Sequence, residues 1–218
     1  AAGAVLHYLR DTEHPNLQHI TSLQRIDRED YLWMDRFTIR NLELTGAAHD
    51  EGNNLLKVLD NTVSPMGARL LKRWILLPQK DIRRINERLD LVEYFIKEAD
   101  LRNQLVHHIK QCGDIERLVS KIPLKKINPR EVVQIAKGLH HVAQLKTLIA
   151  TAPQPYLAQL AASLDGCSTI ADKITREIEE NPPVVLAKGG VIREGVHAEL
   201  DELRKISSGG KEYLTVLQ

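Results

Sequence analysis

The chain has 218 residues, of which 30 are basic and 29 acidic, so its formal net charge of +1 neither favours nor excludes a nucleic-acid partner. Its two cysteines, Cys112 and Cys167, are too few and too far apart for a disulfide scaffold or a CxxC motif, and they fit a reducing compartment. No apolar run approaches the roughly 20 residues of a membrane span, and AAGAVLHYLR lacks the features of a signal peptide.

A mainly α-helical protein is the expected fold, because aromatic residues make up only 4% of the chain while Leu, Ile, Ala, Lys, Arg and Glu dominate it. Near the N-terminus, residues 17–34 differ, since HITSLQRI alternates between apolar and polar residues and DRED supplies a polar turn. We predict a small β-hairpin element there. Short helices are expected next, within DRFTIRNLELT (35–45) and LLKVLD (55–60).

Two amphipathic helices follow. In residues 65–77 an apolar stripe runs through Met66, Leu70 and Trp74, with Leu71 and Ile75 beside it, which predicts a wide buried face. Residues 81–98 repeat the pattern through Ile82, Ile85, Leu89, Val92 and Ile96. Further helices are predicted at 99–111, 114–121, 130–150, 155–164 and 168–180, and prolines mark several of their ends. The predicted fold is therefore an irregular helical bundle.

The C-terminal part combines a turn and a long helix. Apolar residues flank Lys188, Gly189 and Gly190, which predicts a second hairpin. Residues 196–218 have a helical pattern that SSGG (207–210) weakens, because each Gly costs about 1 kcal/mol relative to Ala. We expect residues 207–218 to fray, kink at the glycines or pack against another molecule. The chain lacks an initiating Met and stops within this pattern, so a fragment of a longer protein is expected.

Motifs for catalysis and phosphate binding are absent from the sequence. The nearest segment to GxxxxGK[ST], SSGGKEY, lacks the upstream Gly and the hydroxyl after the Lys, and there is no GxSxG or HExxH. The adjacent pairs His107/His108 and His140/His141 each point about 100° apart on a helix, so neither pair can hold one metal ion. The segment KGGVIREG is more typical of a turn than of a phosphate-binding loop. We expect no catalytic, cofactor-binding or metal-binding residue in this chain.

The segment DNTVSPMGARLLKRW (60–74) first suggests a phosphate-binding loop, because a Gly lies beside a helix start and three cations follow it. A helix start alone explains it, with Ser64 as N-cap and Pro65 at the first helical position. Gly67 then admits a close neighbour. Two groups of cations lie on these helices. The first is Arg69, Lys72 and Arg73, and the second, on the following helix, is Arg83, Arg84 and Arg88. Each group is either a solvated or ion-paired face or a contact to phosphate or an acidic partner.

Three motifs follow one another in the chain: DRFTIRNLEL, LLKVLDNTVSPMGARLLKRWILLP and DIRRINERLDLVEYF. In this order they resemble the core, or lever, region of the MutS family of DNA mismatch-repair proteins, often called domain III. The resemblance covers essentially the whole chain. Ser64 stands where the family usually has Thr, and it caps equally well. The matching positions are Asp35, Thr38, Arg40, Asn41, Leu42, Glu43, Leu44, Leu59, Asp60, Thr62, Pro65, Met66, Gly67, Arg69, Leu70, Leu71, Trp74, Ile85, Arg88, Leu89, Asp90 and Val92.

This resemblance implies a division of the chain and a role for it. Residues 1–16 would end a connector segment, 17–195 would form the helical core, and 196–218 would be the descending lever helix, ending before the clamp insertion. The full-length protein would be a homodimeric, DNA-dependent ATPase that uses ATP and Mg²⁺, binds mismatched duplex DNA and engages downstream repair factors. It would act in the bacterial cytoplasm, at the nucleoid, without a membrane. The fragment itself would not be an enzyme.

The resemblance leads to a mechanical hypothesis. Residues 196–218 would form a rod of about 35 Å that couples ATP state to DNA binding and clamp closure. In this hypothesis the helix after Ser64 is an interior scaffold packed by Leu70, Leu71 and Trp74, while Arg69 and Arg73 meet acidic neighbours. The alternative is an autonomous helical scaffold or DNA-binding module. It would use the face of Arg69, Lys72 and Arg73 and the face of Arg83, Arg84 and Arg88. Of these, Lys72, Arg73, Arg83 and Arg84 are the candidate contacts to DNA or a partner.

Overall fold

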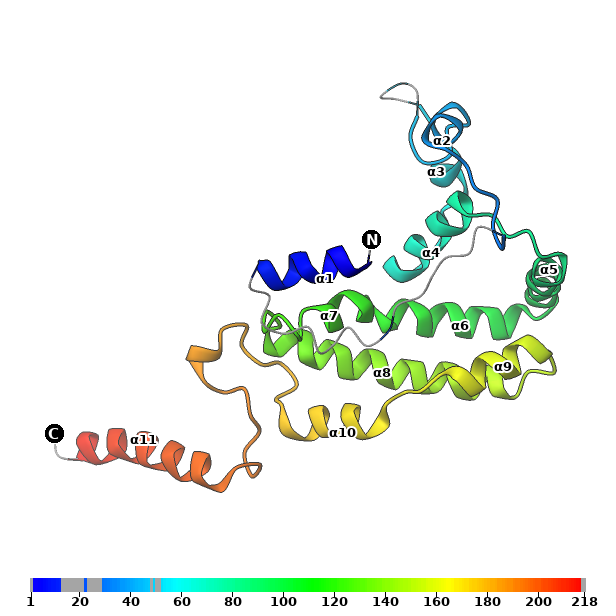
Figure 1. Cartoon of the computed structure of the whole chain (residues 1–218). Helices are drawn as coiled ribbons and strands as arrows, with labels where there is room; N and C mark the ends of the chain where they lie inside the picture. The colour runs from blue at the N-terminus through cyan, green and yellow to red at the C-terminus, as the bar shows by residue number, and fades with distance from the viewer. Residues whose placement is uncertain (1, 13–21, 23–28, 48, 50–51, 217–218) are drawn as a thin grey trace.

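The computed structural model describes residues 2–12, 22, 29–47, 49 and 52–216. Helices dominate this part of the chain (Figure 1). In chain order they are α1 (Ala2–Asp11), α2 (Arg36–Asn41), α3 (Leu55–Leu59), α4 (Pro65–Leu76), α5 (Ile82–Lys97), α6 (Ala99–Cys112), α7 (Ile115–Ser120), α8 (Pro129–Ala150), α9 (Pro155–Ser163), α10 (Ser168–Glu177), the 3₁₀ turn η1 (Leu186–Lys188) and α11 (Ala198–Val216).

Side-chain caps explain where many of these helices begin. The cap oxygen accepts a hydrogen bond from a backbone N–H of the first turn, which would otherwise lack a partner. At α8, Asn128 and Glu131 form a reciprocal capping box, and a proline follows the cap of α4, α8 and α9. The capping residues are Asp35, Asn54, Ser64, Asp81, Asp114, Asn128 and Gln154.

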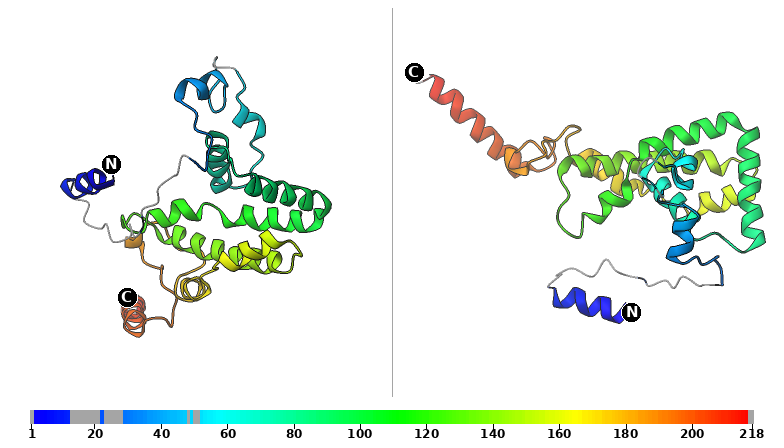
Figure 2. Two further views of the ribbon diagram at one scale, coloured as in Figure 1. Left: turned by 45° about the vertical axis from the view of Figure 1, so that its right-hand side comes forward. Right: turned by 90° about the horizontal axis from the view of Figure 1, so that it is seen from above.

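The longest helix, α8, is the centre of the bundle. It packs against α6, α7, α9 and α10, and Figures 1 and 2 show these helices around it. Leu105, Ile149, Leu157 and Ala161 form the buried core between α6, α8 and α9. Gly138 lets α8 approach the end of α6 closely, since a Cβ there would lie 2.6 Å from the Cys112 carbonyl oxygen.

The apolar stripes of α4 and α5 are not buried as predicted. On α4, Leu70 is 47% and Trp74 42% exposed. On α5, Ile85 is half-buried, while Ile82, Leu89, Val92 and Ile96 are exposed. The face of α5 that packs against the core instead carries Leu91, Tyr94 and Phe95. A 3–4 spacing identifies an apolar face, but whether another element covers that face depends on the tertiary arrangement.

The predicted hairpin in residues 17–34 lies mostly outside the described residues. Its described end does not pair with a neighbouring strand, because Tyr31 forms an isolated antiparallel bridge with Gln79. The N–H of Leu32 donates to the carbonyl of Pro78 at 2.8 Å, and that of Lys80 to Asp30 at 3.1 Å. This segment therefore pairs with the loop between α4 and α5.

The second predicted hairpin, around Lys188, is not found in the structure. Gly189 and Gly190 do turn the chain, with φ of 68° and 67°, but the apolar residues before them form η1. The residues that pair are further apart in the sequence than predicted, since Ile178 forms an antiparallel bridge with Ile192. A turn signal predicts a reversal of the chain without stating which residues meet across it.

Helix α11 extends from the bundle on the side away from α5 (Figures 1 and 2). Its helical backbone continues through Gly209 and Gly210 to Val216. The two glycines therefore do not end the helix.

Candidate functional site at the start of α4

The first family motif, DRFTIRNLEL (35–44), forms α2 and contacts the start of α3. Asp35 accepts a hydrogen bond from the Thr38 backbone N–H at 2.7 Å, and bonds to Thr38 hold the pKa of Asp35 below its usual range. After α2, Glu43 adopts a left-handed conformation with φ of 48°. Its carbonyl and that of Leu44 then accept the N–H groups of Leu55 and Leu56 at 2.9 and 3.0 Å. The motif therefore caps α3 through its backbone.

In the second family motif, two sets of local hydrogen bonds fix the start of α4. Asp60 accepts bonds from the Thr62 hydroxyl at 2.6 Å and backbone N–H at 3.0 Å, which lower the pKa of Asp60. Ser64, which is 8% exposed, then accepts a bond from the Gly67 N–H at 3.1 Å. A Cβ on Gly67 would lie 3.2 Å from the Ser64 oxygen, so glycine keeps this cap unstrained.

These bonds disfavour a phosphate-binding loop at α4. The Gly67 N–H is already bonded to Ser64, the Ala68 N–H donates to the Ser64 carbonyl at 3.0 Å, and Pro65 has no N–H. The Asp60 carboxylate lies in the same shallow hollow and would repel an anion. The local geometry is that of a helix start.

Arg69 joins α4 to α7. Its guanidinium contacts Asp114 at 2.7 and 3.0 Å and Glu116 at 2.6 and 3.1 Å. The hydrogen bond from Arg69 lowers the pKa of Asp114, and the two carboxylates raise the pKa of Arg69, Asp114 contributing most. The prediction that Arg69 meets acidic neighbours is confirmed.

A cation–π contact joins α5 to α4. The Arg88 guanidinium carbon lies 3.8 Å from the centre of a Trp74 ring. Asp90, on the same helix, forms no ion pair within the described part of the chain. Leu71 is half-buried, while Leu70 and Trp74 remain largely exposed, so α4 is an outer helix held by Arg69 and Arg88.

The four candidate contact cations all lie on exposed positions of α4 and α5. Arg83 and Arg84 reach Asp81 only at 3.6 and 4.0 Å, and their side chains are 85% and 55% exposed. Lys72 and Arg73 form no ion pair with any residue that the structure describes, so the predicted acidic neighbour of Arg73 is not found there. These cations are available to a partner.

Comparison with known proteins identifies the family. The family model for MutS domain III matches residues 37–218. The chain belongs to the MutS family. It is 46% identical over its whole length to the DNA mismatch repair protein MutS of Bacteroides fragilis (strain YCH46) and 46% identical to that of Cytophaga hutchinsonii. Over 98% of its length it is 45% identical to that of Flavobacterium johnsoniae.

This MutS domain III spans about a quarter of the length of the curated relatives it matches, covering 25%, 26% and 25% of these three. None of the helices in its described residues is long and apolar enough to cross a membrane.

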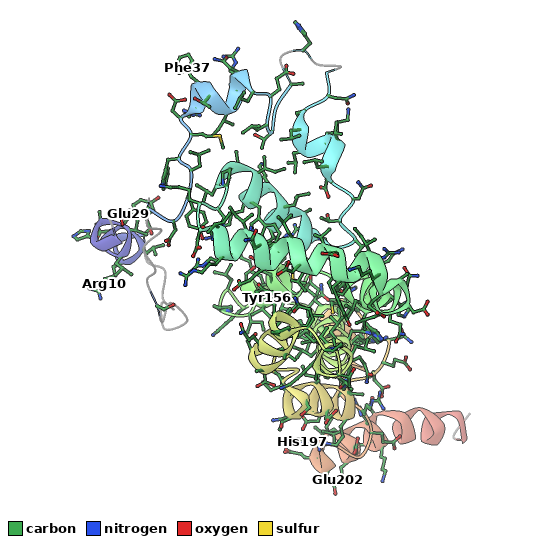
Figure 3. The ribbon with its side chains drawn as sticks, turned by 90° about the vertical axis from the view of Figure 1, so that its right-hand side faces the viewer. Arg10, Glu29, Phe37, Tyr156, His197 and Glu202 are labelled. Carbon is green, nitrogen blue, oxygen red and sulfur yellow. The ribbon has the colours of Figure 1, made fainter. Side chains whose placement is uncertain are left out.

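The structure of this MutS domain III adds two features that the sequence did not predict. On α2, the Phe37 side chain is 77% exposed (Figure 3). With Arg36 and Arg40 it lines an open hollow. At the contact of α6 and α8, the Nδ1 atoms of His108 and His141 lie 3.0 Å apart. Each histidine belongs to one of the adjacent pairs, His107/His108 and His140/His141. The packing of α6 against α8 determines which member of each pair faces the other helix.

Proposed function

We propose that this chain is the structural core of a MutS-type mismatch-repair ATPase and that it couples ATP state to mismatched-DNA binding and clamp closure. The family assignment over the whole chain carries this proposal. In the full-length homodimer, ATP and Mg²⁺ bind outside this chain, α11 is the descending lever, and downstream repair factors respond to the clamp. The protein works in the bacterial cytoplasm on nucleoid DNA, and the chain alone hydrolyses no ATP.

A continuous set of contacts from α11 to the bundle supports the coupling. At the base of α11, Arg204 donates to the Ile192 carbonyl at 2.8 Å and contacts Asp201 at 3.2 Å. Asp201 in turn accepts the Gly195 N–H at 2.8 Å. The first turns of α11 are therefore bonded to the segment that precedes the helix.

That segment is bonded to the end of α10. The Glu179 N–H donates to the Val191 carbonyl at 2.9 Å, and the Arg193 N–H to the Glu177 carbonyl at 2.9 Å. The Arg193 side chain also donates to the Ile178 carbonyl at 2.8 Å. Because α10 packs directly on α8, a rotation of α11 would be passed to the central helix of the bundle.

A packed bundle is suited to pass on such a rotation. Closely packed helices switch between discrete arrangements more readily than they deform continuously. The contacts of Arg69 with Asp114 and Glu116 connect α4 to α7, which packs against α8. The proposed role therefore needs no catalytic group in the chain.

The test uses Arg204→Ala in the full-length protein, with Glu202→Ala as the matched control. Glu202 lies on the same helix and is exposed (Figure 3). The affinity for a mismatched duplex is measured with and without ATP. Allosteric couplings are typically about 5- to 150-fold, and we expect Arg204→Ala to reduce the ATP effect several-fold while Glu202→Ala preserves it. An unchanged ATP effect in a folded Arg204→Ala protein would refute the coupling role.

A second candidate function is an autonomous DNA-binding module, which the exposed Lys72, Arg73, Arg83 and Arg84 favour. Binding through phosphate contacts would weaken steeply with salt, because each contact releases counterions. Fluorescence anisotropy of the 218-residue chain with duplex DNA at several salt concentrations separates the two candidates. The core role predicts little binding by the chain alone. Salt-dependent binding lost in Lys72→Ala/Arg73→Ala would favour the module.

A further inference from the structure

Two histidines from different helices face each other inside this domain. His108 on α6 and His141 on α8 lie 33 residues apart, and their Nδ1 atoms are separated by 3.0 Å. Both are half-buried, and their ring centres lie 5.3 Å apart. Their sequence neighbours point elsewhere, since His107 is exposed and packs its ring edge-on to His108, while His140 reaches the Thr175 hydroxyl at 3.4 Å.

The spacing of the two Nδ1 atoms suits a shared cation. In the metal-free pair, one Nδ1–H donates to the lone pair of the other nitrogen. Metal–imidazole bonds are about 2.0–2.1 Å long, so two nitrogens 3.0 Å apart would subtend about 95° at a common metal ion. That angle fits two neighbouring positions of a tetragonal site, whereas a tetrahedral site needs nitrogens about 3.3 Å apart.

We propose that His108 and His141 form a two-histidine site for a divalent transition metal, with Cu²⁺ and Ni²⁺ preferred over Zn²⁺. Imidazole is a ligand for all three ions, and the tetragonal angle favours the first two. On binding, the Nδ1 proton of the donor histidine moves to its Nε2, so both Nδ1 lone pairs face the metal. Neutral histidines thus bind without net loss of a proton.

A hollow lies beside His141. It has a volume of about 520 Å³ and is lined by His141, Cys112, Asp114 and His140, while His108 is not among its lining residues. No group of three or more His, Cys, Asp or Glu side chains among the described residues is placed to hold a metal, so water completes the coordination.

A metal at this position would connect α6 to α8. The two histidines come together only in the folded chain, so the metal binds the native state in preference to the unfolded one. At metal concentrations about 100 times the Kd, we expect the Tm to rise by about 5 °C or more.

The experiment uses the tag-free chain with Cu²⁺, Ni²⁺ or Zn²⁺ alone, and EDTA as the reference. Thermal unfolding and Cu²⁺ electron paramagnetic resonance are measured for the wild type, His108→Gln and His141→Gln. His107→Gln and His140→Gln are the matched controls, because each removes the neighbouring histidine of a pair. Far-UV circular dichroism verifies that every variant folds.

We expect one Cu²⁺ with two nitrogen ligands in the wild type and both controls. His108→Gln and His141→Gln should each weaken binding at least about tenfold and reduce the Tm shift by about half or more. Equal binding by these two variants, or equal loss in the controls, would refute the site. A Tm rise with Zn²⁺ that exceeds the rise with Cu²⁺ and Ni²⁺ would refute the proposed preference.

Discussion

The Arg69 guanidinium on α4 binds the Asp114 carboxylate at the start of α7 through contacts of 2.7 and 3.0 Å, although the two residues lie 45 positions apart. Asp114 also accepts the Arg117 N–H at 3.3 Å as the N-cap of α7. Glu116 contacts Arg69 as well, but its side chain is 68% exposed, against 18% for Asp114. One carboxylate therefore both begins α7 and holds α4 to it.

Asp114→Ala should destabilise the chain more than Glu116→Ala. Both changes remove a contact to Arg69, but only the first removes a helix cap, which is typically worth about 1 kcal/mol. The free energies of unfolding from urea titrations measure the difference. Equal losses in the two variants would mean that the cap contributes nothing.

Stability should fall as the pH drops below about 6.5, partly because of His141. The folded chain lowers the pKa of this group from 6.5, so the unfolded chain binds a proton that the folded chain does not. This contribution to stability is present above the unfolded pKa and is lost as the pH falls toward the folded pKa. Urea midpoints at pH 7.5 and 5.5 should differ less in His141→Gln than in the wild type. The control His49→Gln, at an exposed histidine outside this cluster, should retain the wild-type difference.

Two helical glycines should respond oppositely to alanine. A Cβ on Gly138 would lie 2.6 Å from the Cys112 carbonyl oxygen and 2.9 Å from the Ile115 side chain, so Gly138→Ala should cost about 1–3 kcal/mol. At Gly209 no atom of the described residues lies within 4 Å of that position, and Gly209→Ala should favour α11 by up to about 1 kcal/mol. Thermal unfolding and helix content measure the two effects. A neutral Gly138→Ala would contradict the close approach of α8 to α6.

Leu105→Ala should destabilise the bundle more than Trp74→Ala, although Trp is the larger residue. Leu105 is 7% exposed in the core, and such truncations cost about 2–5 kcal/mol. Trp74 is 42% exposed, so its loss removes the Arg88 contact and partial burial, about 1–2 kcal/mol. Urea unfolding of both variants measures the order. The reverse order would restore the interpretation of α4 as an interior scaffold.

Local signals predicted the helices well. The expected helix at 81–98 is Ile82–Lys97, and that at 130–150 is Pro129–Ala150. Caps such as Asn128 and prolines at first helical positions act within one turn, so the sequence contains all the information they need. The same holds for the Ser64 cap and for the family motifs, which are contiguous.

Contacts between distant segments were not predictable in this way. The apolar stripe of α5 suggested a buried face, but the bundle covers a different side of the helix, with Leu91 and Phe95. The bridge of Ile178 with Ile192 was not predicted either, and neither was that of Tyr31 with Gln79. Spacing along a chain states which residues share a face, but it contains no information about which element lies opposite.

By itself, the sequence determined the helix starts, the family and the lack of a contiguous catalytic motif, because these depend on residues close together in the chain. Only the tertiary structure decided that Arg69 reaches Asp114, that α4 remains an outer helix and that His108 meets His141. The physical reason is the same for all three, since each depends on how whole helices pack against α7 and α8.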